Sequence, residues 1–349
     1  MEYSISISVQ TERQVKDTKS IPFGMQPTEH MFIAAYRDGQ WQDSRIMPFT
    51  NLSMSPLALC LHYGQTVFEG MKAFMMEDGS VNIFRPDKHY DRFTKSLDRM
   101  CMPQVPKDLF MEALHQLVQL DASWVPAESD GSLYIRPFMI ATEDRIGVKI
   151  SDEYLFMIVC TPAYQYYSKP LKVKVEDKYV RAAEGGTGFA KCGGNYGASF
   201  YPTKLAKEQG YDQVLWTDSK NHEFIEESGT MNVMFVIDGT LLTPPLSGTI
   251  LDGITRDSLL AIAQEKGIKT EVRPIRHKEI IDALAAGKRV EAFGAGTAAV
   301  IAPIEVIAVG GKEYTCYLGE DALMYQLAND LLAIRKGHRP DNHNWNYIV

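Results

Sequence analysis

The feature that most constrains the fold is a mixture of short apolar runs and amphipathic helical patterns along a chain of 349 residues. Apolar runs of strand length predict strands at residues 31–36, 81–84, 132–139, 154–160, 213–216 and 231–237. Apolar residues at helical spacing predict helices at 107–124, 256–266, 278–286 and 320–336. A chain of this length normally forms two domains, and the mixture predicts that both are α/β (α+β).

Turn and stop residues divide these segments. Asp38-Gly39 predicts a hairpin turn, and Gly267, Gly287 and Gly337 follow three of the helical patterns as helix-ending glycines do. Residues 162–178 change character, with two prolines and clustered tyrosines, which is typical of a domain junction. We expect a smaller domain at 1–165, an interdomain loop at 166–177 and a larger domain at 178–349.

Composition excludes several classes of function. Lys plus Arg total 36 against 44 Asp plus Glu, a net charge of -8, which argues against binding to nucleic acid or an anionic membrane. The first 20 residues lack the apolar stretch of a secretion signal, which predicts a cytoplasmic protein. Five scattered cysteines without Cys-x-x-Cys, and histidines without a ligand-pair spacing, predict neither a disulfide framework nor a metal site.

The residues next to Lys191 in the sequence are unusually small, as the run GFAKCGGNYG at residues 188–197 shows. A lysine that forms an imine needs a partly desolvated amine and room beside it for a flat ring, and small neighbours supply that room. A solvated surface lysine is the ordinary alternative. The surroundings favour Lys191 as the lysine that carries pyridoxal phosphate.

Three other residues suit the same cofactor. Tyr196 can meet its phenolic oxygen, Glu227 its pyridine nitrogen, and Arg85 its phosphate. Each also has an ordinary interpretation: a core tyrosine, a solvated loop carboxylate, and a surface salt bridge at the end of a strand before a proline-stopped turn. Local sequence does not decide between them.

Glycine clusters offer places for a phosphate. Gly253 precedes a helix whose first free N–H groups belong to Ile254 and Thr255, an arrangement that binds anions. A plain helix start with Thr255 as N-cap is the alternative. The run at Gly294 and Gly296 comes nearest to a dinucleotide motif but lacks its third glycine.

Taken together, these segments resemble the branched-chain amino acid aminotransferases, members of the fold-type IV group of pyridoxal phosphate enzymes. The resemblance runs from about residue 22 to the C-terminus. It is carried by LHYGQTVFEGMKAF at 61–74, FRP at 84–86, SLYIRP at 132–137, KCGGNYG at 191–197, QVLW at 213–216, GTMN at 229–232 and GAGTA at 294–298.

The resemblance implies a role for each matching residue. Lys191 would form the Schiff base, Glu227 would pair with the pyridine nitrogen and Tyr196 with the phenolic oxygen. The phosphate would be held by Arg85, Ile254, Thr255 and Thr297, with Arg181 near the cofactor. The substrate pocket would draw on Phe23, Phe68, Tyr134, Tyr164, Thr230 and Ala298. Arg136, placed one strand face away from Tyr134, would stand at the pocket mouth, and Tyr63 would come from the partner of a homodimer.

The implied reaction is the reversible transfer of an amino group from L-leucine, L-isoleucine or L-valine to 2-oxoglutarate, with the cofactor between the domains. A D-amino acid aminotransferase, an aminodeoxychorismate lyase or an inactive homologue are the alternatives. The animal enzymes carry a redox-sensitive Cys-x-x-Cys after Gly-Thr-Ala, whereas Ala299 and Ala302 stand here, so that control is absent. The preferred substrate, the physiological direction and assembly beyond a dimer are left open.

Overall fold

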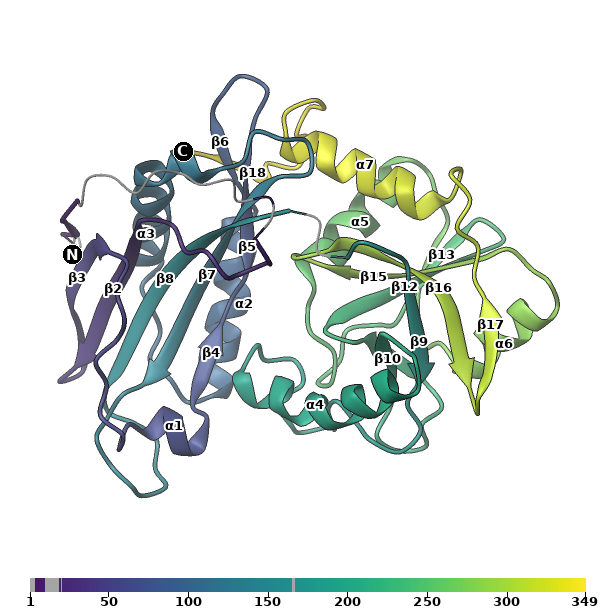
Figure 1. Ribbon diagram of the computed structural model, residues 1–349, viewed down its shortest axis with the longest axis horizontal. Helices are drawn as coiled ribbons and strands as arrows, with labels where there is room; N and C mark the ends of the chain where they lie inside the picture. The colour runs from purple at the N-terminus through teal and green to yellow at the C-terminus, as the bar shows by residue number, and fades with distance from the viewer. Residues whose placement is uncertain (1–3, 10–18, 20, 165–166) are drawn as a thin grey trace. The chain divides into compact units, whose positions relative to one another are not determined.

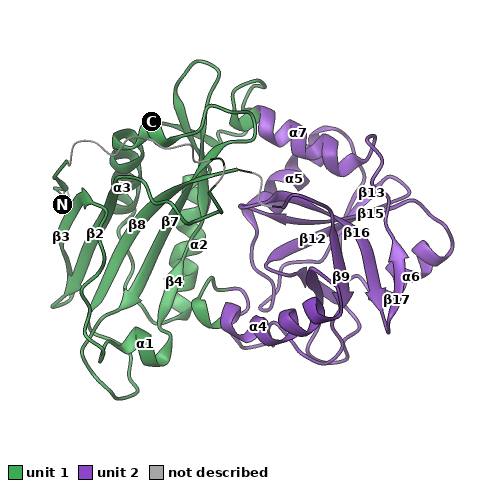
Figure 2. Cartoon of the chain, in the orientation of Figure 1, with its two compact units in different colours: residues 1–166, 190–194, 334–349 green, residues 167–189, 195–333 purple. Residues whose placement is uncertain are grey.

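The computed structural model describes residues 4–9, 19, 21–164 and 167–349. The chain forms two compact units (Figure 2). Unit 1 comprises Met1–Tyr166, Ala190–Gly194 and Ile334–Val349, and unit 2 comprises Tyr167–Phe189 and Asn195–Ala333. The expected domain limits at 165 and 178 stay a prediction, and residue 166 of the expected loop lies outside the described residues.

Unit 1 is built on a mostly antiparallel sheet (Figure 1). Its strand order is β1 (Ser6–Ile7), β3 (Gln40–Pro48), β2 (His30–Arg37), β8 (Tyr154–Ala163), β7 (Ser132–Ala141), β5 (Met71–Met75), β6 (Val81–Phe84) and β18 (Asn346–Ile348). The short strand β4 (Thr66–Phe68) pairs with the other end of β7. Asp38 and Gly39 join β2 to β3 with φ of 52° and 76°, which confirms the expected hairpin turn.

Helices cover one face of this sheet (Figure 1). They are α2 (Pro86–Arg99) and α3 (Lys107–Leu120), followed by the short 3-10 helix η1 (Ala122–Trp124), while the short helix α1 (Leu59–Tyr63) precedes β4. Phe93 and Leu97 of α2 and Phe110 of α3 are fully buried in the core with Ile83 and Ile135 of the sheet. The predicted helix at 107–124 therefore exists but ends as α3 and η1.

Helix α2 corrects the sequence interpretation of Arg85. We expected Pro86 to stop a strand at a turn, but Pro86 is the first residue of a 14-residue helix and Arg85 is its N-cap. Proline suits that position because the first helical N–H has no partner in the helix and the fixed φ of proline is already helical. Arg85 is 7% exposed, so it is not a surface residue.

Unit 2 is built on a sheet that closes on itself. Its strand order is β11 (Ile225–Ser228), β10 (Gln213–Thr217), β9 (Leu171–Val175), β16 (Val300–Val309), β15 (Val290–Gly296), β12 (Met231–Ile237), β13 (Thr240–Thr243) and β14 (Thr270–Val272). β11 also pairs with β12, which joins six strands into a ring, and β17 (Lys312–Thr315) pairs with β16. Val173, Val233, Phe235 and Ile304 are fully buried in its core.

Four helices accompany this sheet in the sequence: α4 (Gly193–Glu208), α5 (Ile254–Glu265), α6 (His277–Ala285) and α7 (Leu323–Arg335). Gly267, Gly287 and Gly337 have φ between 68° and 78° after α5, α6 and α7, as the stop signals predict. The sequence analysis missed α4, because its glycine-rich start and internal Pro202 hide a helical pattern. No helix among the described residues is long and apolar enough to span a membrane.

Candidate active site

Lys191 is fixed in unit 1 by its own backbone. Its N–H donates to Ser96 Oγ at 2.9 Å, and its carbonyl accepts the Phe68 N–H at 3.0 Å. The side-chain Nζ lies 4.9 Å from the centre of the Phe68 ring. A Cβ on Gly193 would lie 2.7 Å from Thr66 Oγ1, so a small residue is required there. The small neighbours of Lys191 therefore permit a close approach of two backbone segments.

Phe68, Tyr134 and Arg136 gather on one face of the unit 1 sheet. Arg136 Nη2 donates to the Tyr134 hydroxyl at 2.9 Å, and its guanidinium carbon lies 4.7 Å from the Phe68 ring centre. Residues two apart on a strand point to the same side, so our expectation that Arg136 lies one strand face away from Tyr134 was wrong. Phe23 packs edge-on against Tyr134 at 4.9 Å.

Gly70 makes room for Tyr134, because a Cβ on Gly70 would overlap the Tyr134 hydroxyl oxygen. Two other predicted pocket residues, Tyr63 on α1 and Tyr164 after β8, belong to the same unit, and the contacts described for them are with other residues. Tyr63 is 40% exposed and its ring contacts His62, while the Tyr164 ring lies 5.8 Å from Lys19 Nζ. The roles of these two tyrosines stay predictions.

A buried carboxylate beneath this face was not anticipated by the sequence analysis. Glu69 is fully buried between Phe68 and Gly70, and it accepts hydrogen bonds from Arg92 Nε at 2.7 Å and His89 Nδ1 at 2.8 Å. Burial by itself would raise the pKa of Glu69, but the charge and hydrogen bonds of Arg92 hold it below its usual range. Burial lowers the pKa of His89 to about 4. An acidic residue inside the apolar run VFEGM was the available signal.

Unit 2 contributes a second buried carboxylate, Glu227, on β11. It is 3% exposed, its Oε1 accepts the Leu251 N–H at 2.8 Å, and its Oε2 lies 3.2 Å from Arg181 Nε. Arg181 also donates to the carbonyl oxygens of Gly188 and Thr249. The interpretation of Glu227 as a solvated loop residue is therefore wrong. The carboxylate is paired with a cation and accepts a backbone donor.

Glu226 lies beside Glu227 and behaves differently. Thr249 Oγ1 donates to its Oε1 at 2.5 Å, while its Oε2 is buried without a hydrogen-bond partner among the described residues. Burial, aided by the charge of Glu227, raises the pKa of Glu226 to about 7. Consecutive carboxyl groups on one strand thus have different hydrogen-bond partners.

The start of α5 offers backbone donors. Gly253, not Thr255, is the N-cap, and no side chain caps the helix. A Cβ on Gly253 would overlap Asn232 Oδ1, so only glycine fits. Ile254 and Thr255 are the first two helical residues and are buried. An uncapped N-terminus with a positive dipole is suited to a phosphate.

The remaining predicted residues of unit 2 are placed on separate segments. Tyr196 is half-buried on α4, Thr230 is exposed in the turn between β11 and β12, and Thr297 and Ala298 are half-buried between β15 and β16. The Gly294 and Gly296 pair before them serves packing, because a Cβ on either would lie 2.6 Å or 3.1 Å from Met231 side-chain atoms. These two glycines are therefore explained by packing without a dinucleotide site.

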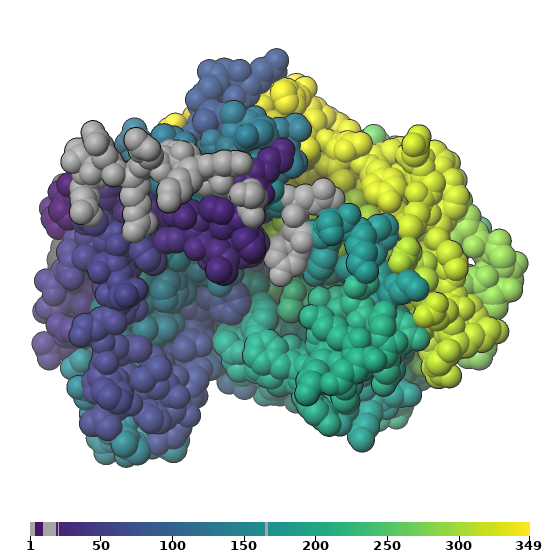
Figure 3. All heavy atoms as spheres, in the orientation of Figure 1, coloured from purple at the N-terminus to yellow at the C-terminus, as the bar shows by residue number. Residues whose placement is uncertain are grey.

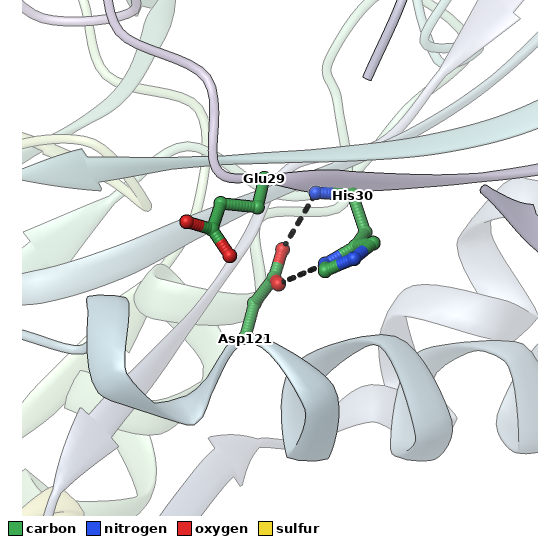
Figure 4. A group of neighbouring side chains, drawn as sticks. All are labelled: Glu29, His30 and Asp121. Carbon is green, nitrogen blue, oxygen red and sulfur yellow. Dashed lines mark hydrogen bonds and ion pairs between the residues drawn. The ribbon is translucent and has the colours of Figure 1, made fainter. Parts of the chain in front are cut away.

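The described part of the chain contains one group with metal-ligand geometry, formed by Glu29, His30 and Asp121 (Figure 4). Asp121, at the end of α3, accepts the His30 backbone N–H at 3.2 Å and lies 2.6 Å from His30 Nδ1. These bonds attach the start of β2 to α3. The hydrogen bonds between His30 and Asp121 give the group a structural role. The absence of a metal cofactor stays a prediction.

Comparison with known proteins fits this geometry. The chain matches the family model for amino-transferase class IV over residues 66–307. Branched-chain-amino-acid transaminase 1 of Bacillus subtilis (strain 168) is 44% identical over 345 residues, which are 97% of this chain and 96% of that protein.

Solved structures agree in fold. The branched-chain aminotransferase of the thermophilic archaeon Thermoproteus uzoniensis, solved with norvaline, is 24% identical, with a TM-score of 0.75 over 91% of this chain and 99% of that one. The holo-form of the Thermobaculum terrenum enzyme, in its PLP-form, has a TM-score of 0.77 at 22% identity, over 92% and 98% of the two chains. At these identities both are likenesses of fold.

The chain therefore belongs to the class IV aminotransferases and, at 44% identity over almost its whole length, to their branched-chain amino acid aminotransferase family. The family resemblance, the fold-type IV class and the enzyme class expected from the sequence are confirmed.

Proposed function

We propose that this protein uses pyridoxal phosphate to transfer the amino group of L-leucine, L-isoleucine or L-valine to 2-oxoglutarate, giving a branched 2-oxo acid and L-glutamate. The observation that carries the proposal is the presence in one chain of Lys191, packed on an aromatic ring, and of the buried Glu227, paired with Arg181. The named activities of the relatives, at up to 44% identity, support the same reaction.

The residues present fit the cofactor. Lys191 would hold it covalently, and Glu227 would pair with its ring nitrogen, because that carboxylate is buried and fixed by a backbone donor and Arg181. The uncapped N–H groups of Ile254 and Thr255, with Arg85 and Thr297, would hold its phosphate. Tyr196 would meet the phenolic oxygen, and Arg181 would orient Glu227. When bound, the cofactor supplies an electron sink for the substrate α-carbon.

The protein's own part in the reaction is to move a proton and exclude water. Lys191 Nζ, released by the incoming amine, would act as the base that takes the α-proton and returns it at the cofactor. The Phe68 ring beside Nζ lowers local polarity and keeps the amine partly desolvated.

The substrate pocket must accept two kinds of side chain. The rings of Phe23, Phe68 and Tyr134 present an apolar surface for a branched side chain. Arg136 and the Tyr134 hydroxyl present donors for the second carboxylate of glutamate. Tyr164, Thr230 and Ala298 would complete the pocket. One methylene in such a pocket is worth about 1–3 kcal/mol, so weak discrimination among the three substrates is expected.

We also propose a homodimer in which Tyr63 serves the partner's site. The segment at 50–64 and the loop at 144–150 lie side by side, joined by an Ala58–Asp144 bridge, and both are visible at the lower left of Figure 3. They expose apolar residues: Leu57 42%, Leu61 57%, Tyr63 40%, Ile146 68% and Val148 85%. Several exposed apolar residues on neighbouring segments are typical of a protein interface. Five free cysteines support a reducing, cytoplasmic location.

The proposal is tested with purified protein and a panel of amino donors, L and D forms included, with 2-oxoglutarate as acceptor. We expect a yellow protein, activity with L-leucine, L-isoleucine and L-valine, and loss of both colour and activity in Lys191→Ala. Activity confined to D-alanine or D-glutamate would replace the substrate assignment. A colourless protein that pyridoxal phosphate does not reconstitute would overturn the enzyme assignment.

A further inference from the structure

The main chain of Lys191 is held at both of its polar atoms by unit 1. Its N–H donates to Ser96 Oγ of α2 at 2.9 Å, and its carbonyl oxygen accepts the N–H of Phe68, the last residue of β4, at 3.0 Å. The next residue is tied to the same strand, because a β-bridge joins Cys192 to Val67. The backbone of Lys191 therefore lies between a helix and a strand that together decide where its side chain starts.

Ser96 is fully buried on α2, and its hydroxyl makes two hydrogen bonds with fixed roles. A backbone N–H can only donate, so Oγ accepts the bond from Lys191. Its own proton is donated to the Arg92 carbonyl oxygen, one helical turn earlier, at 3.0 Å. A serine that bonds back to its own helix in this way keeps a lone pair for a donor from another segment. Alanine at position 96 would leave the Lys191 N–H without this acceptor.

Arg92 and Glu69 join α2 to the strand on the other side of Lys191. Glu69 follows Phe68, and its carboxylate accepts Arg92 Nε at 2.7 Å and Arg92 Nη2 at 2.8 Å. This bidentate geometry fixes the orientation of the two groups as well as their distance. The contacts close into one loop, which we call the lysine clamp: Lys191, Ser96, Arg92, Glu69 and Phe68.

The charges of the clamp balance one another. Because the charge and hydrogen bonds of Arg92 outweigh burial, the pKa of Glu69 lies below its usual range, while burial lowers the pKa of His89 to about 4. At neutral pH the group therefore holds one negative and one positive charge beside a neutral imidazole. A buried ion pair is weak evidence for stability, because apolar residues of the same volume often serve as well. A balanced pair beside Lys191 is suited to fixing its position.

We propose that Ser96 and Glu69 are positioning residues for Lys191, and that the lysine clamp holds its Nζ against the Phe68 ring during the reaction. The inference rests on the proposed function, in which Nζ takes a proton and returns it and must keep its place through both steps. Lysine carries its amine on a flexible four-carbon stem, so Nζ is placed no better than the backbone beneath it. Both residues act through Lys191 and not on the substrate.

The test compares Ser96→Ala with Ser151→Ala in the holoenzyme. Ser151 is a buried serine of unit 1 outside the clamp, and its Oγ likewise accepts a backbone N–H and donates to a backbone carbonyl, both of Glu153, at 3.2 Å and 2.7 Å. Hydrogen–deuterium exchange of the Lys191 amide is followed by mass spectrometry of overlapping peptides. In parallel, kcat and KM for L-leucine are measured at saturating cofactor.

We expect the Lys191 amide to exchange at least about tenfold faster in Ser96→Ala and at the wild-type rate in Ser151→Ala. In Ser96→Ala, kcat should fall about tenfold while KM changes less than about twofold, since a misplaced Nζ slows proton transfer without altering substrate binding. Ser151→Ala should keep both constants within about twofold. Equal kcat in the two variants overturns the proposal, and so does unchanged exchange in Ser96→Ala, because the serine would then not hold this N–H.

Glu69 is tested with Glu69→Gln, and Asp121→Asn is its matched control. Asp121 is another buried carboxylate of unit 1, 1% exposed and 2.6 Å from His30 Nδ1. Both variants are expected to lose stability, so both are assayed where they are fully folded, and Glu69→Gln alone should lose kcat about tenfold at unchanged KM. Equal kcat in the two would overturn the role of Glu69. If Glu69→Gln does not fold, Ser96→Ala decides the proposal.

Leucine transamination by wild type separates this inference from the proposed function. An inactive wild type would overturn the proposed function and, with it, the role of the clamp in the reaction. An active wild type with an equally active Ser96→Ala would overturn the clamp alone and leave the proposed function standing.

Discussion

Both units bury charged side chains, and they stabilise them by different means. Unit 1 places cations against aromatic rings, as Arg335 does on Phe84 and Arg136 on Phe68. Unit 2 places a carboxylate, Glu227, against a backbone N–H and an arginine. The difference teaches that a ring face can stabilise a buried cation, whereas a buried carboxylate is held by donors in either unit, as Glu69 and Glu227 are.

The largest effect is expected from removing the unit 2 charge. Glu227→Gln should lower kcat for L-leucine about 10²–10³-fold, because a neutral amide cannot hold a positive ring nitrogen and leaves Arg181 without its partner. Steady-state kinetics at saturating cofactor measures this. Glu227→Asp, which keeps the charge, should retain more activity, and a loss under about threefold in Glu227→Gln would contradict the role assigned to the carboxylate.

Glu69, the buried carboxylate of unit 1, provides a second test of the comparison. Glu69→Gln should reduce the free energy of unfolding by about 3–5 kcal/mol, because Arg92 is left buried without its counter-charge. Denaturant unfolding measures it. Asp282→Asn breaks a surface pair whose side chains are 72% and 61% exposed, and it should cost at most about 1 kcal/mol. Equal costs would mean that burial is not the deciding factor.

Glu226 sharpens the comparison through pH. Its pKa in the folded protein is about 7, above the ordinary 4.5, so the protonated carboxyl is favoured by folding. The stability it contributes is complete below pH 4.5 and is lost as the pH rises through about 7. Glu226→Gln should therefore become more stable relative to wild type, by about 1–3 kcal/mol between about pH 5 and about pH 8. Parallel stability curves in thermal or urea unfolding would exclude this.

The smallest effect concerns the hydroxyl that meets Arg136. Tyr134→Phe removes the acceptor of a 2.9 Å hydrogen bond while keeping the ring that packs on Phe23. The KM for 2-oxoglutarate should rise about fivefold, corresponding to about 1 kcal/mol, while the KM for L-leucine changes less than about twofold. Equal changes in the two constants would show that the hydroxyl has no part in recognising the second carboxylate.

Much of the fold could be predicted because its signals are local. The hairpin at Asp38, the strand at 231–237 and the glycines ending three helices each follow from the chemistry of a few adjacent residues. Helices α2 and α4 were missed, because Pro86 and the glycines near 193 indicate turns when read alone. The start of a helix depends on neighbours several residues away, which a local motif does not contain.

The residues of the site also divide into those that the sequence identified and those that it did not. Lys191 and Glu227 were identified from sequence, through small neighbours and a family resemblance, and each now has a defined set of partners. Lys72 and Arg335 were not identified, because nothing in their local sequence marks a buried ionisable group, and Glu69 was missed although it stands inside the apolar run VFEGM. Arg136 was assigned to the wrong face until the strand alternation was applied to it.

The sequence by itself determined the family, the mixed architecture and the identity of the lysine, because motifs such as KCGGNYG and GAGTA carry that information in adjacent residues. Only the tertiary structure decided the pKa values of the ionisable groups and the residues that contact them. Burial and partners come from segments far apart in the chain, as Arg335 and Asn82 illustrate, and the pKa of a side chain depends on those two quantities.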